Sequence, residues 1–376
     1  MSVPCVLALL PLLSIAMASQ PTSFRAMTFN VLANEYAKVE WFFKDSATVK
    51  SKAPHFYWNH RFPLNVNLVK DSGADLLFLQ EVDRYTSYPE GVKAFLPAGS
   101  DAPNGLWGNE LQNLSYDSIF MGRTRHVPAN EPPKPSTAPE EGLATAWKPR
   151  FSVIHHEKVE MPEATEHLTP TKMNVAIWTV LKDSVTGERI ITGNTHLNHR
   201  NWGKTIRAHQ ISLLKSKAHE LQHKFPSAPV IISGDFNMRP DEPGYAIMIR
   251  DESKVNSEAF WEDLKSHEST VKADGITKEI EKPSSADWDQ IRKDCLQFIP
   301  AVDQLGQLDT VSHKTPNFQG LLDHMFTIPS LDGKKLVLQS KQVLPAIEDI
   351  GYYPDLTHGS DHLPRSAEFF IQSVDL

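Results

Sequence analysis

The chain has 376 residues, of which 40% are hydrophobic and 22% are charged, a composition that is ordinary for a globular protein. Its formal net charge of -8 argues against a protein that coats long nucleic acids nonspecifically, because such proteins usually present a basic face. This charge is still compatible with a local basic cleft, or with an acidic site whose metal ion supplies positive charge.

The N-terminal segment, residues 1–18, is predicted to be a signal peptide. An apolar run from Val6 to Ala18 is too short to span a bilayer, and Ala16-Met17-Ala18 has the small-x-small pattern of a cleavage site. A mitochondrial presequence is the alternative, but the segment lacks Arg and an amphipathic pattern. We therefore expect a secreted protein or one in an endomembrane lumen. No later stretch is apolar enough to predict a membrane span.

Two predicted strands near the start of the chain each carry a polar side chain at their end. Residues 23–32 are predicted to form a strand with Asn30 near its end, and residues 75–82 contain a continuous apolar run followed by Glu81. Residues 57–69 between them have the apolar spacing of a helix. A carboxylate directly after a buried strand is costly unless it is solvated or bound to a cation.

The middle of the chain is predicted to hold a long surface loop and then a series of strands. Residues 89–139 are rich in Pro, Gly, Asn and Glu, and we interpret them as loop with at most one short strand. Further strands are predicted at 142–148, 175–181 and 189–195.

His196 comes directly off the last of these strands, although a lone histidine in such a place is more often structural than catalytic. Arg200, Lys204 and Arg207 follow closely, and they form either a basic rim or the solvated start of a helix.

The stretch from Pro229 to Asn237 is the centre of the predicted site. Three β-branched residues, Val230 to Ile232, predict a strand that is buried on both faces. Gly234 frees the backbone, and Asp235 and Asn237 then point the same way because they are two residues apart in an extended chain. The alternative is a strand that runs into an ordinary polar turn.

The C-terminal third adds two more polar groups near strands. Residues 251–307 are polar, with a helix or two expected around Trp261 and Trp288, and core packing is the better interpretation of Trp288 than base stacking. Asp323 interrupts an apolar strand, and Asp361 with His362 precedes the last strand.

These groups make sense together if the strands converge and their ends form one pocket. Glu81, Asp235 and Asp361 are then predicted to bind Mg²⁺, with Mn²⁺ as the alternative ion. His196, Asn30 and Asn237 would hydrogen-bond a phosphoryl group, and His362, oriented by Asp323, would activate water. Because no cysteine or His-x-x-x-His pair suggests one, no zinc site is expected.

The motifs at these positions resemble the endonuclease/exonuclease/phosphatase superfamily. They are Thr28-Phe-Asn-Val-Leu, Leu79-Gln-Glu-Val-Asp, Asn194-Thr-His-Leu, Ser233-Gly-Asp-Phe-Asn, Leu322-Asp-His-Met-Phe and Ser360-Asp-His. The resemblance implies a catalytic domain over residues 24–373 and a four-layered α/β sandwich, with two central mixed β-sheets flanked by helices. It also implies Mg²⁺- or Mn²⁺-dependent hydrolysis of phosphoester bonds.

Within the superfamily the chain looks most like the nocturnin, Angel and cytoplasmic deadenylase branch. Trp58-Asn-His-Arg61 and Thr195-His-Leu-Asn-His-Arg200 carry this resemblance, and Arg200 is therefore included among the substrate-binding residues with Asn30 and Asn237. The implied function is that of a 3′-end RNA exonuclease of the deadenylase type, acting as a monomer. The alternative is a phosphatase or phosphodiesterase for a dinucleotide phosphate, an inositol phosphate or a sphingolipid headgroup, and a non-catalytic binding protein is a third reading.

Overall fold

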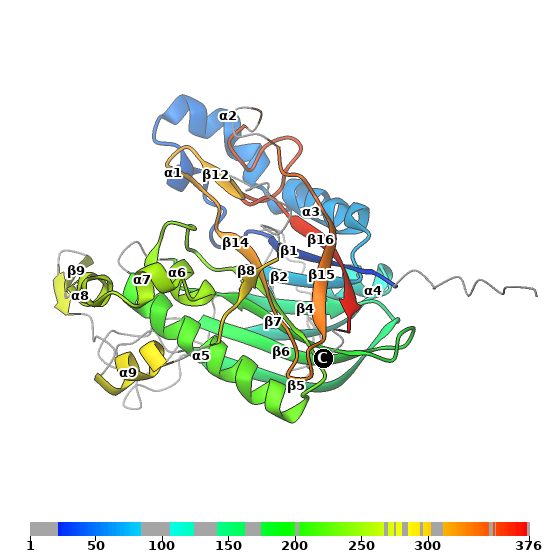
Figure 1. Ribbon diagram of the computed structural model, residues 1–376. Helices are drawn as coiled ribbons and strands as arrows, with labels where there is room; N and C mark the ends of the chain where they lie inside the picture. Colours follow the sequence, from blue (N-terminus) through cyan, green and yellow to red (C-terminus); the bar gives the residue numbers. More distant parts are fainter. Residues whose placement is uncertain are drawn as a thin grey trace, which may run out of the picture.

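Two six-stranded mixed sheets form the centre of the computed structural model (Figure 1). It describes residues 22–83, 106–123, 141–161, 174–199, 203–266, 270–273, 276–279, 285–293, 296–301, 311–345, 349 and 351–373. The first sheet has the order β15 (Lys335–Lys341), β16 (Arg365–Gln372), β1 (Phe24–Asn30), β2 (Leu76–Asp83), β4 (Glu141–Trp147) and β3 (Asp117–Gly122). The second has the order β11 (Ile299–Pro300), β14 (Asp323–Ile328), β8 (Val230–Asp235), β7 (Arg189–His196), β6 (Asn174–Asp183) and β5 (Phe151–Met161).

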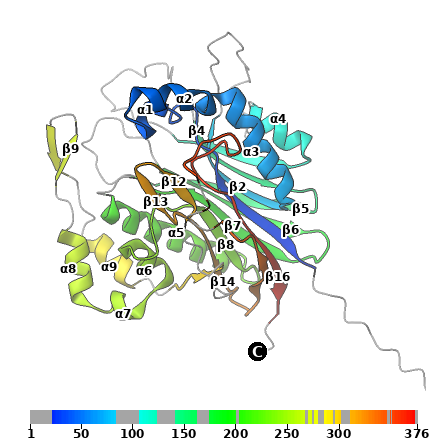
Figure 2. The ribbon, with the colours of Figure 1, turned by 90° about the horizontal axis from the view of Figure 1, so that it is seen from above.

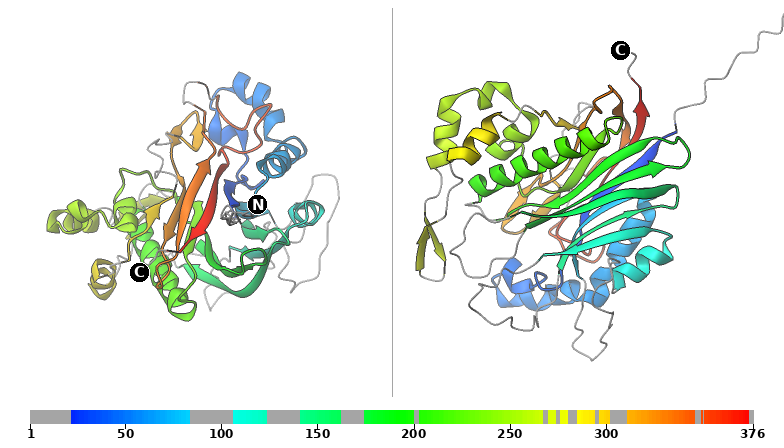
Figure 3. Two further views of the ribbon diagram at one scale, coloured as in Figure 1. Left: turned by 45° about the vertical axis from the view of Figure 1, so that its right-hand side comes forward. Right: turned by 90° about the horizontal axis from the view of Figure 1, so that it is seen from below.

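Helices cover the outer faces of both sheets (Figures 2 and 3). The helices are α1 (Val39–Phe42), α2 (Ser46–Phe56), α3 (Trp58–Ser72), α4 (Leu106–Asn113), α5 (Lys204–Lys224), α6 (Pro243–Ile249), α7 (Glu252–Val255), α8 (Glu258–Ser266) and α9 (Ser285–Lys293). Two short hairpins complete the described elements, β9 (Thr270–Ala273) with β10 (Ile276–Glu279), and β12 (His313–Thr315) with β13 (Phe318–Gly320). No helix among the described residues is long and apolar enough to cross a membrane.

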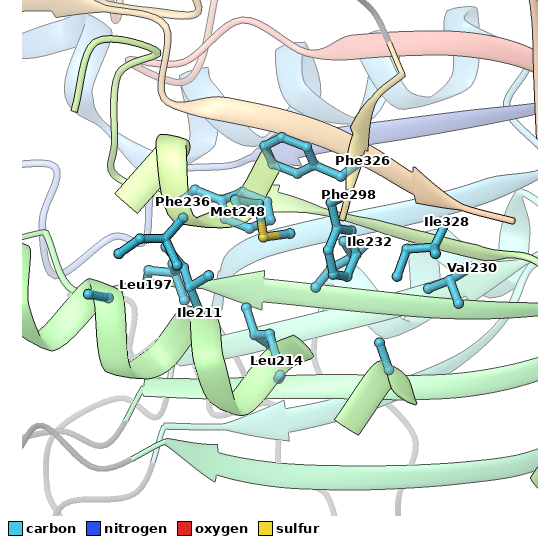
Figure 4. Close-up of a cluster of buried hydrophobic side chains, with 14 of the residues drawn as sticks. Leu197, Ile211, Leu214, Val230, Ile232, Phe236, Met248, Phe298, Phe326 and Ile328 are labelled. Carbon is cyan, nitrogen blue, oxygen red and sulfur yellow. The ribbon is translucent and has the colours of Figure 1, made fainter. Parts of the chain in front are cut away.

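Three apolar clusters join the layers. The middle cluster lies between the sheets and includes Phe78 of β2 and Ile231 of β8. A second cluster packs the first sheet against α3 and α4. The third packs the second sheet against α5 and α6, with Ile211 and Leu214 of α5 facing Ile232 (Figure 4). The order helix, sheet, sheet, helix confirms the predicted four-layered sandwich.

Strand direction explains why polar groups gather at one end of this sandwich. β1 runs parallel to β2, and β7 runs parallel to β8, so their carboxyl ends meet at the same edges. β14 runs antiparallel to β8 and begins where β8 ends, with Asp323 opposite Asp235. Asp323 therefore stands at the first position of its strand and does not interrupt it, which corrects the expectation from sequence.

The two sheets are tied together by buried amides as well as by apolar contacts. Asn194 on β7 donates to the carbonyl oxygens of Leu79 (3.1 Å) and Ala144 (3.0 Å) in the other sheet. Its own amide oxygen accepts a 2.8 Å bond from Gln80. Asn194 is fully buried, so its amide depends on these three groups for its partners.

Several local predictions differ from the structure. Residues 106–113, inside the stretch interpreted as loop, form α4, because Trp107 and Leu111 are buried against the first sheet. β5 was not predicted, since its side chains are mostly exposed and its sequence lacks a clean alternation. Trp288 is buried beside Trp261, in agreement with core packing. Arg61 is fully buried and donates to the carbonyl oxygens of Phe56 and Leu32, so its role is structural.

Candidate active site

A cleft of about 790 Å³ opens over the converging strand ends. Of the predicted site residues, six line it: Glu81, His196, Asp235, Asn237, Asp361 and His362. Asn30 and Asp323 lie behind this lining and contact it through hydrogen bonds. Arg200 lies outside the described residues. The structure thus brings eight of the nine predicted residues to one place, while their roles remain predictions.

Asn30 connects the two sheets at the floor of the cleft. Its amide nitrogen lies 3.1 Å from Glu81 Oε1 on one side and 3.1 Å from Asp235 Oδ2 on the other. Its amide oxygen accepts the backbone N–H of Leu32, which fixes which end of the amide faces the carboxylates. Asn30 therefore orients two acidic groups that come from different sheets.

A second chain of contacts leads to His362. Its Nδ1 lies 2.7 Å from Asp323 Oδ2, and the same oxygen accepts the hydroxyl of Ser312 at 2.7 Å. With Nδ1 engaged, His362 turns Nε2 toward Asp235, whose Oδ2 lies 3.6 Å away. His196 Nε2 reaches the same carboxylate oxygen at 3.5 Å. Asp235 thus lies between two imidazoles and the Asn30 amide.

Asp361 has a partner that the sequence did not reveal. His313 Nε2 lies 3.2 Å from Asp361 Oδ2, and its ring packs edge-on against His362 with centroids 4.5 Å apart. No motif marks His313 in the sequence. It reaches the site because β12 forms an isolated bridge between His313 and His362.

Backbone irregularities aim three of these side chains. The pairing of β2 with β4 shifts register between Leu79 and Val82, and Glu81 within this bulge has φ of 55°. A bulge re-aims a side chain out of the sheet, here into the cleft. Asn237 has φ of 49° and Leu32 has φ of 56°, a cluster of left-handed residues of the kind found at functional sites.

Gly234 is required by a close approach of two strands. A Cβ at this position would lie 2.0 Å from the carbonyl oxygen of Thr195 in β7. Only glycine lets β8 run this close to β7 and deliver Asp235 beside His196. Asn237 follows, and its amide donates to the carbonyl of Leu197 at 3.1 Å, so the turn that carries it is tied back to β7.

The electrostatics of the cleft are dominated by carboxylates. Burial raises the pKa of Glu81 to about 8, and the nearby charges of Asp361 and Glu141 add to this rise. Burial likewise raises the pKa of Asp235 to about 6, although His362 opposes the shift. Burial alone would raise the pKa of Asp361, but the bond from His313 and the charge of His362 lower it to about 2.

His362 responds to the same charges. Burial alone would lower its pKa, but Asp323, Asp235 and Asp361 raise the pKa well above the ordinary 6.5. The predicted role of His362 as a general base therefore requires part of this negative charge to be compensated.

The residues present fit a hard divalent cation. Glu81, Asp235 and Asp361 line the same cleft, and Asp361 Oδ1 is buried without a hydrogen-bond partner in the described part of the chain. Two groups of three ligand-type residues have their ligand atoms within 4.8 Å of one another, His313 with Asp361 and His362, and Asp235 with Asp323 and His362. Glu81 belongs to neither group, so the ligand atoms of Glu81, Asp235 and Asp361 do not all lie within 4.8 Å of one another.

The cleft wall includes residues that no motif indicated. Tyr36 donates to Glu141 Oε1 at 3.0 Å, and Arg123 donates to the same oxygen at 3.1 Å. Trp41 and Phe318 line the same cleft, with 52% and 39% of their surfaces exposed. Asn317 links them by donating to the carbonyl oxygens of Trp41 and Phe42, each at 3.2 Å.

Comparison with known proteins finds remote relatives. No model of a known protein family matches the chain. It is similar to carbon catabolite repressor protein 4 homolog 4 of Arabidopsis thaliana, at 21% identity over 93% of this chain and 78% of that protein. The CCR4-Not complex 3′-5′-exoribonuclease subunit Ccr4 of Mycosarcoma maydis is 21% identical over 94% of this chain and 51% of its own length. Protein angel homolog 2 of Bos taurus is 26% identical over 63% and 38%. The chain thus spans about half or less of the last two proteins.

Solved structures share the fold. ANGEL2, described as a 2′,3′-cyclic phosphatase, superimposes with a TM-score of 0.62 at 19% identity, over 93% of this chain and 95% of that one. The human Nocturnin catalytic domain with a bound sulfate anion gives a TM-score of 0.57 at 18% identity over the same shares.

Proposed function

We propose that this chain, which has the fold of the endonuclease/exonuclease/phosphatase superfamily and resembles its nocturnin, Angel and CCR4 branch, hydrolyses phosphodiester bonds at the 3′ end of RNA. It is a phosphoric ester hydrolase, and Mg²⁺ is the proposed cofactor. The observation that carries the proposal is the continuous set of contacts from Ser312 through Asp323, His362, Asp235 and Asn30 to Glu81, at the floor of one cleft.

Each residue in this set has a task that its geometry allows. Asp323 fixes the tautomer and orientation of His362, so that only Nε2 faces the reacting groups. His362 and Asp235 lie together where a water molecule would be deprotonated. His196 and Asn237, which also line the cleft, would hydrogen-bond the phosphoryl oxygens as negative charge develops. A divalent cation bound by Glu81, Asp235 and Asp361 would polarise the phosphoryl group.

The walls of the cleft favour a substrate with a base over a simple sugar phosphate. Trp41 and Phe318 offer exposed aromatic surface, and base stacking is tolerant of sequence. Lys204 lines the same cleft and offers positive charge for a phosphate backbone, whereas Arg123 is paired with Glu141 and Arg239 with Asp241 and Glu242. The name of the Mycosarcoma maydis relative, a 3′-5′-exoribonuclease subunit, points to RNA as well.

The test offers the purified protein labelled poly(A) RNA, mixed-sequence RNA and a nicotinamide dinucleotide phosphate in parallel, with Mg²⁺ or with EDTA. We expect Mg²⁺-dependent shortening of RNA from its 3′ end. Asp235→Ala and Glu81→Ala should abolish it, and the exposed-site variant Glu262→Ala should not.

Other outcomes reassign or reject the proposal. Phosphate release from the dinucleotide with intact RNA would move the protein to the class of small-molecule phosphatases. RNA shortening that survives both site substitutions would mean that the cleft is not the active site.

A further inference from the structure

Helix α5 carries two exposed histidines, one turn apart, in its last two turns. Contrary to the expectation from sequence, His219 and His223 form a His-x-x-x-His pair, within the segment His219-Glu-Leu-Gln-His223. The start of α5 at Lys204 lines the active-site cleft. At a rise of about 1.5 Å per residue, the histidine pair lies roughly 22 Å farther along the helix axis. It is therefore separate from the site described above.

The two imidazoles lie close enough to become a chelate. Their Nε2 atoms share a 3.2 Å hydrogen bond, in which one nitrogen carries the proton that a metal ion would displace, and the rings meet at 85° with centroids 4.4 Å apart. Zinc binds imidazole nitrogen at about 2.0–2.1 Å, so two nitrogens in a tetrahedral site are about 3.3 Å from each other. Without a metal ion, α5 thus holds both nitrogens near the separation that a bound ion requires, which reduces the entropic cost of ordering the two side chains on binding.

The surroundings are compatible with added positive charge. The pair lies at the carboxyl end of α5, where the helix dipole favours cations. The charge of Lys217 is offset, because its Nζ lies 2.8 Å from Glu157 and 2.5 Å from Glu220, whereas Lys224 contacts His155 at 3.4 Å.

We propose that His219 and His223 form a surface site for a transition-metal ion of the zinc class. Imidazole nitrogen suits Zn²⁺, Ni²⁺ and Cu²⁺, whereas Mg²⁺ prefers oxygen. The remaining coordination positions are taken by water, because both histidines are exposed and neither of the three-ligand groups among the described residues includes them.

The site binds metal without catalysing hydrolysis. In the His-Glu-x-x-His pattern of metalloproteases the glutamate acts as general base. Here Glu220 is paired with Lys217, and the histidines lie on the exposed side of a surface helix and not in a cleft.

The test is calorimetric titration of the full protein with Zn²⁺ in saturating Mg²⁺. The variants are His219→Ala, His223→Ala and the matched control His156→Ala, which removes an exposed histidine on β5. We expect one Zn²⁺ site that weakens at least about tenfold in either α5 variant, because a chelate becomes a single ligand. The control should bind like the wild type, and Mg²⁺-dependent hydrolysis should be unchanged in all three variants.

Circular dichroism of the variants checks that α5 remains folded, which alanine favours. Unchanged Zn²⁺ binding in both α5 variants would overturn the proposal. So would a Zn²⁺ signal that is lost only in Glu81→Ala, since the ion would then occupy the cleft.

Discussion

At the scale of single residues, the site is organised by pairs in which one side chain orients another. Asp323 does not line the cleft, yet it accepts from both His362 and Ser312. Asn30 also lies behind the lining, and its amide nitrogen donates to both Glu81 and Asp235. Loss of such supporting groups typically costs about 10- to 100-fold in activity.

Asp323→Asn should therefore reduce kcat strongly with little effect on KM. The amide would present an N–H to His362 Nδ1 and favour the wrong tautomer, a change that can cost about 10²- to 10⁴-fold in rate. Steady-state kinetics on RNA measure it, with the exposed Asp332→Asn as control. A KM effect without a kcat effect would place Asp323 in binding and not in orienting His362.

Trp41 is the residue through which substrate choice can be tested. Trp41→Ala should raise KM for RNA about 5- to 100-fold while kcat is retained, because a stacked base contributes about 1–3 kcal/mol. Tyr57→Ala is the matched control, since Tyr57 is 60% exposed but does not line the cleft. Equal kinetics for both variants would mean that Trp41 contacts no base.

At the scale of elements, the sandwich depends on polar contacts between its sheets. Asn194 satisfies groups on β2 and β4 that no water can reach, because it is fully buried. These contacts also fix the position of β7, which carries His196 into the cleft.

Asn194→Ala should lower the free energy of unfolding by about 3 kcal/mol or more. It removes the amide donor from the carbonyl groups of Leu79 and Ala144, and each buried unsatisfied group costs about 1–3 kcal/mol, whereas the Gln80 amide keeps its bonds to Thr28 and Phe78. Urea unfolding measures the loss, and the exposed Asn256→Ala should change stability by less than about 0.5 kcal/mol. A loss as small as that of the control would show that the sheets do not rely on this amide.

The turn between β6 and β7 supplies a pH-dependent contribution to stability. Asp183 accepts from Arg150 Nε at 2.9 Å and from another Arg150 nitrogen at 2.7 Å. Burial alone would raise the pKa of Asp183, but these bonds and those from Val185 and Thr186 lower it below its ordinary value. A lowered folded-state pKa stabilises the protein above the unfolded pKa of about 3.9, and this stabilisation is lost as the pH falls further.

Asp183→Asn should therefore be less stable than the wild type at pH 7 by about 1–3 kcal/mol, with the difference shrinking toward pH 3. Urea unfolding of both proteins across this range measures the trend. A difference that stays constant with pH would assign the effect to packing and not to charge.

At the scale of the whole molecule, sequence reasoning recovered the strands that carry motifs and missed elements that carry none. β1, β2, β7 and β8 are apolar runs that end in polar groups, so both their existence and their shared edge could be predicted. β5 and α4 could not be predicted in this way. The mostly exposed side chains of β5 and the polar residues around α4 hide the apolar periodicity of these two elements. His313 and Trp41 reach the cleft only through tertiary contacts. For His313 the contact is an isolated bridge to His362, and for Trp41 it is the hydrogen bond from Asn317.

The molecule also concentrates repulsion where it is proposed to bind its cation. Glu81, Asp235 and Asp361 line one cleft, and their mutual repulsion disfavours the folded state unless a cation compensates it. Mg²⁺ should therefore raise the Tm of the wild type over its value in EDTA, because an ion that binds only the folded state stabilises it by mass action. At an ion concentration of about 100 times Kd this amounts to about 2.7 kcal/mol, or several degrees.

Glu81→Gln should relieve part of the repulsion and should also reduce the rise of Tm with Mg²⁺. At pH 9, above the raised pKa of Glu81, its Tm in EDTA should equal or exceed that of the wild type, since one of the crowded charges is gone, and its rise with Mg²⁺ should be smaller because a ligand is lost. Glu262→Gln, on the exposed face of α8, should behave like the wild type in both conditions. Scanning calorimetry of the three proteins decides the matter. If Mg²⁺ raises the Tm equally in all three proteins, the ion binds outside the cleft and Glu81 is not one of its ligands.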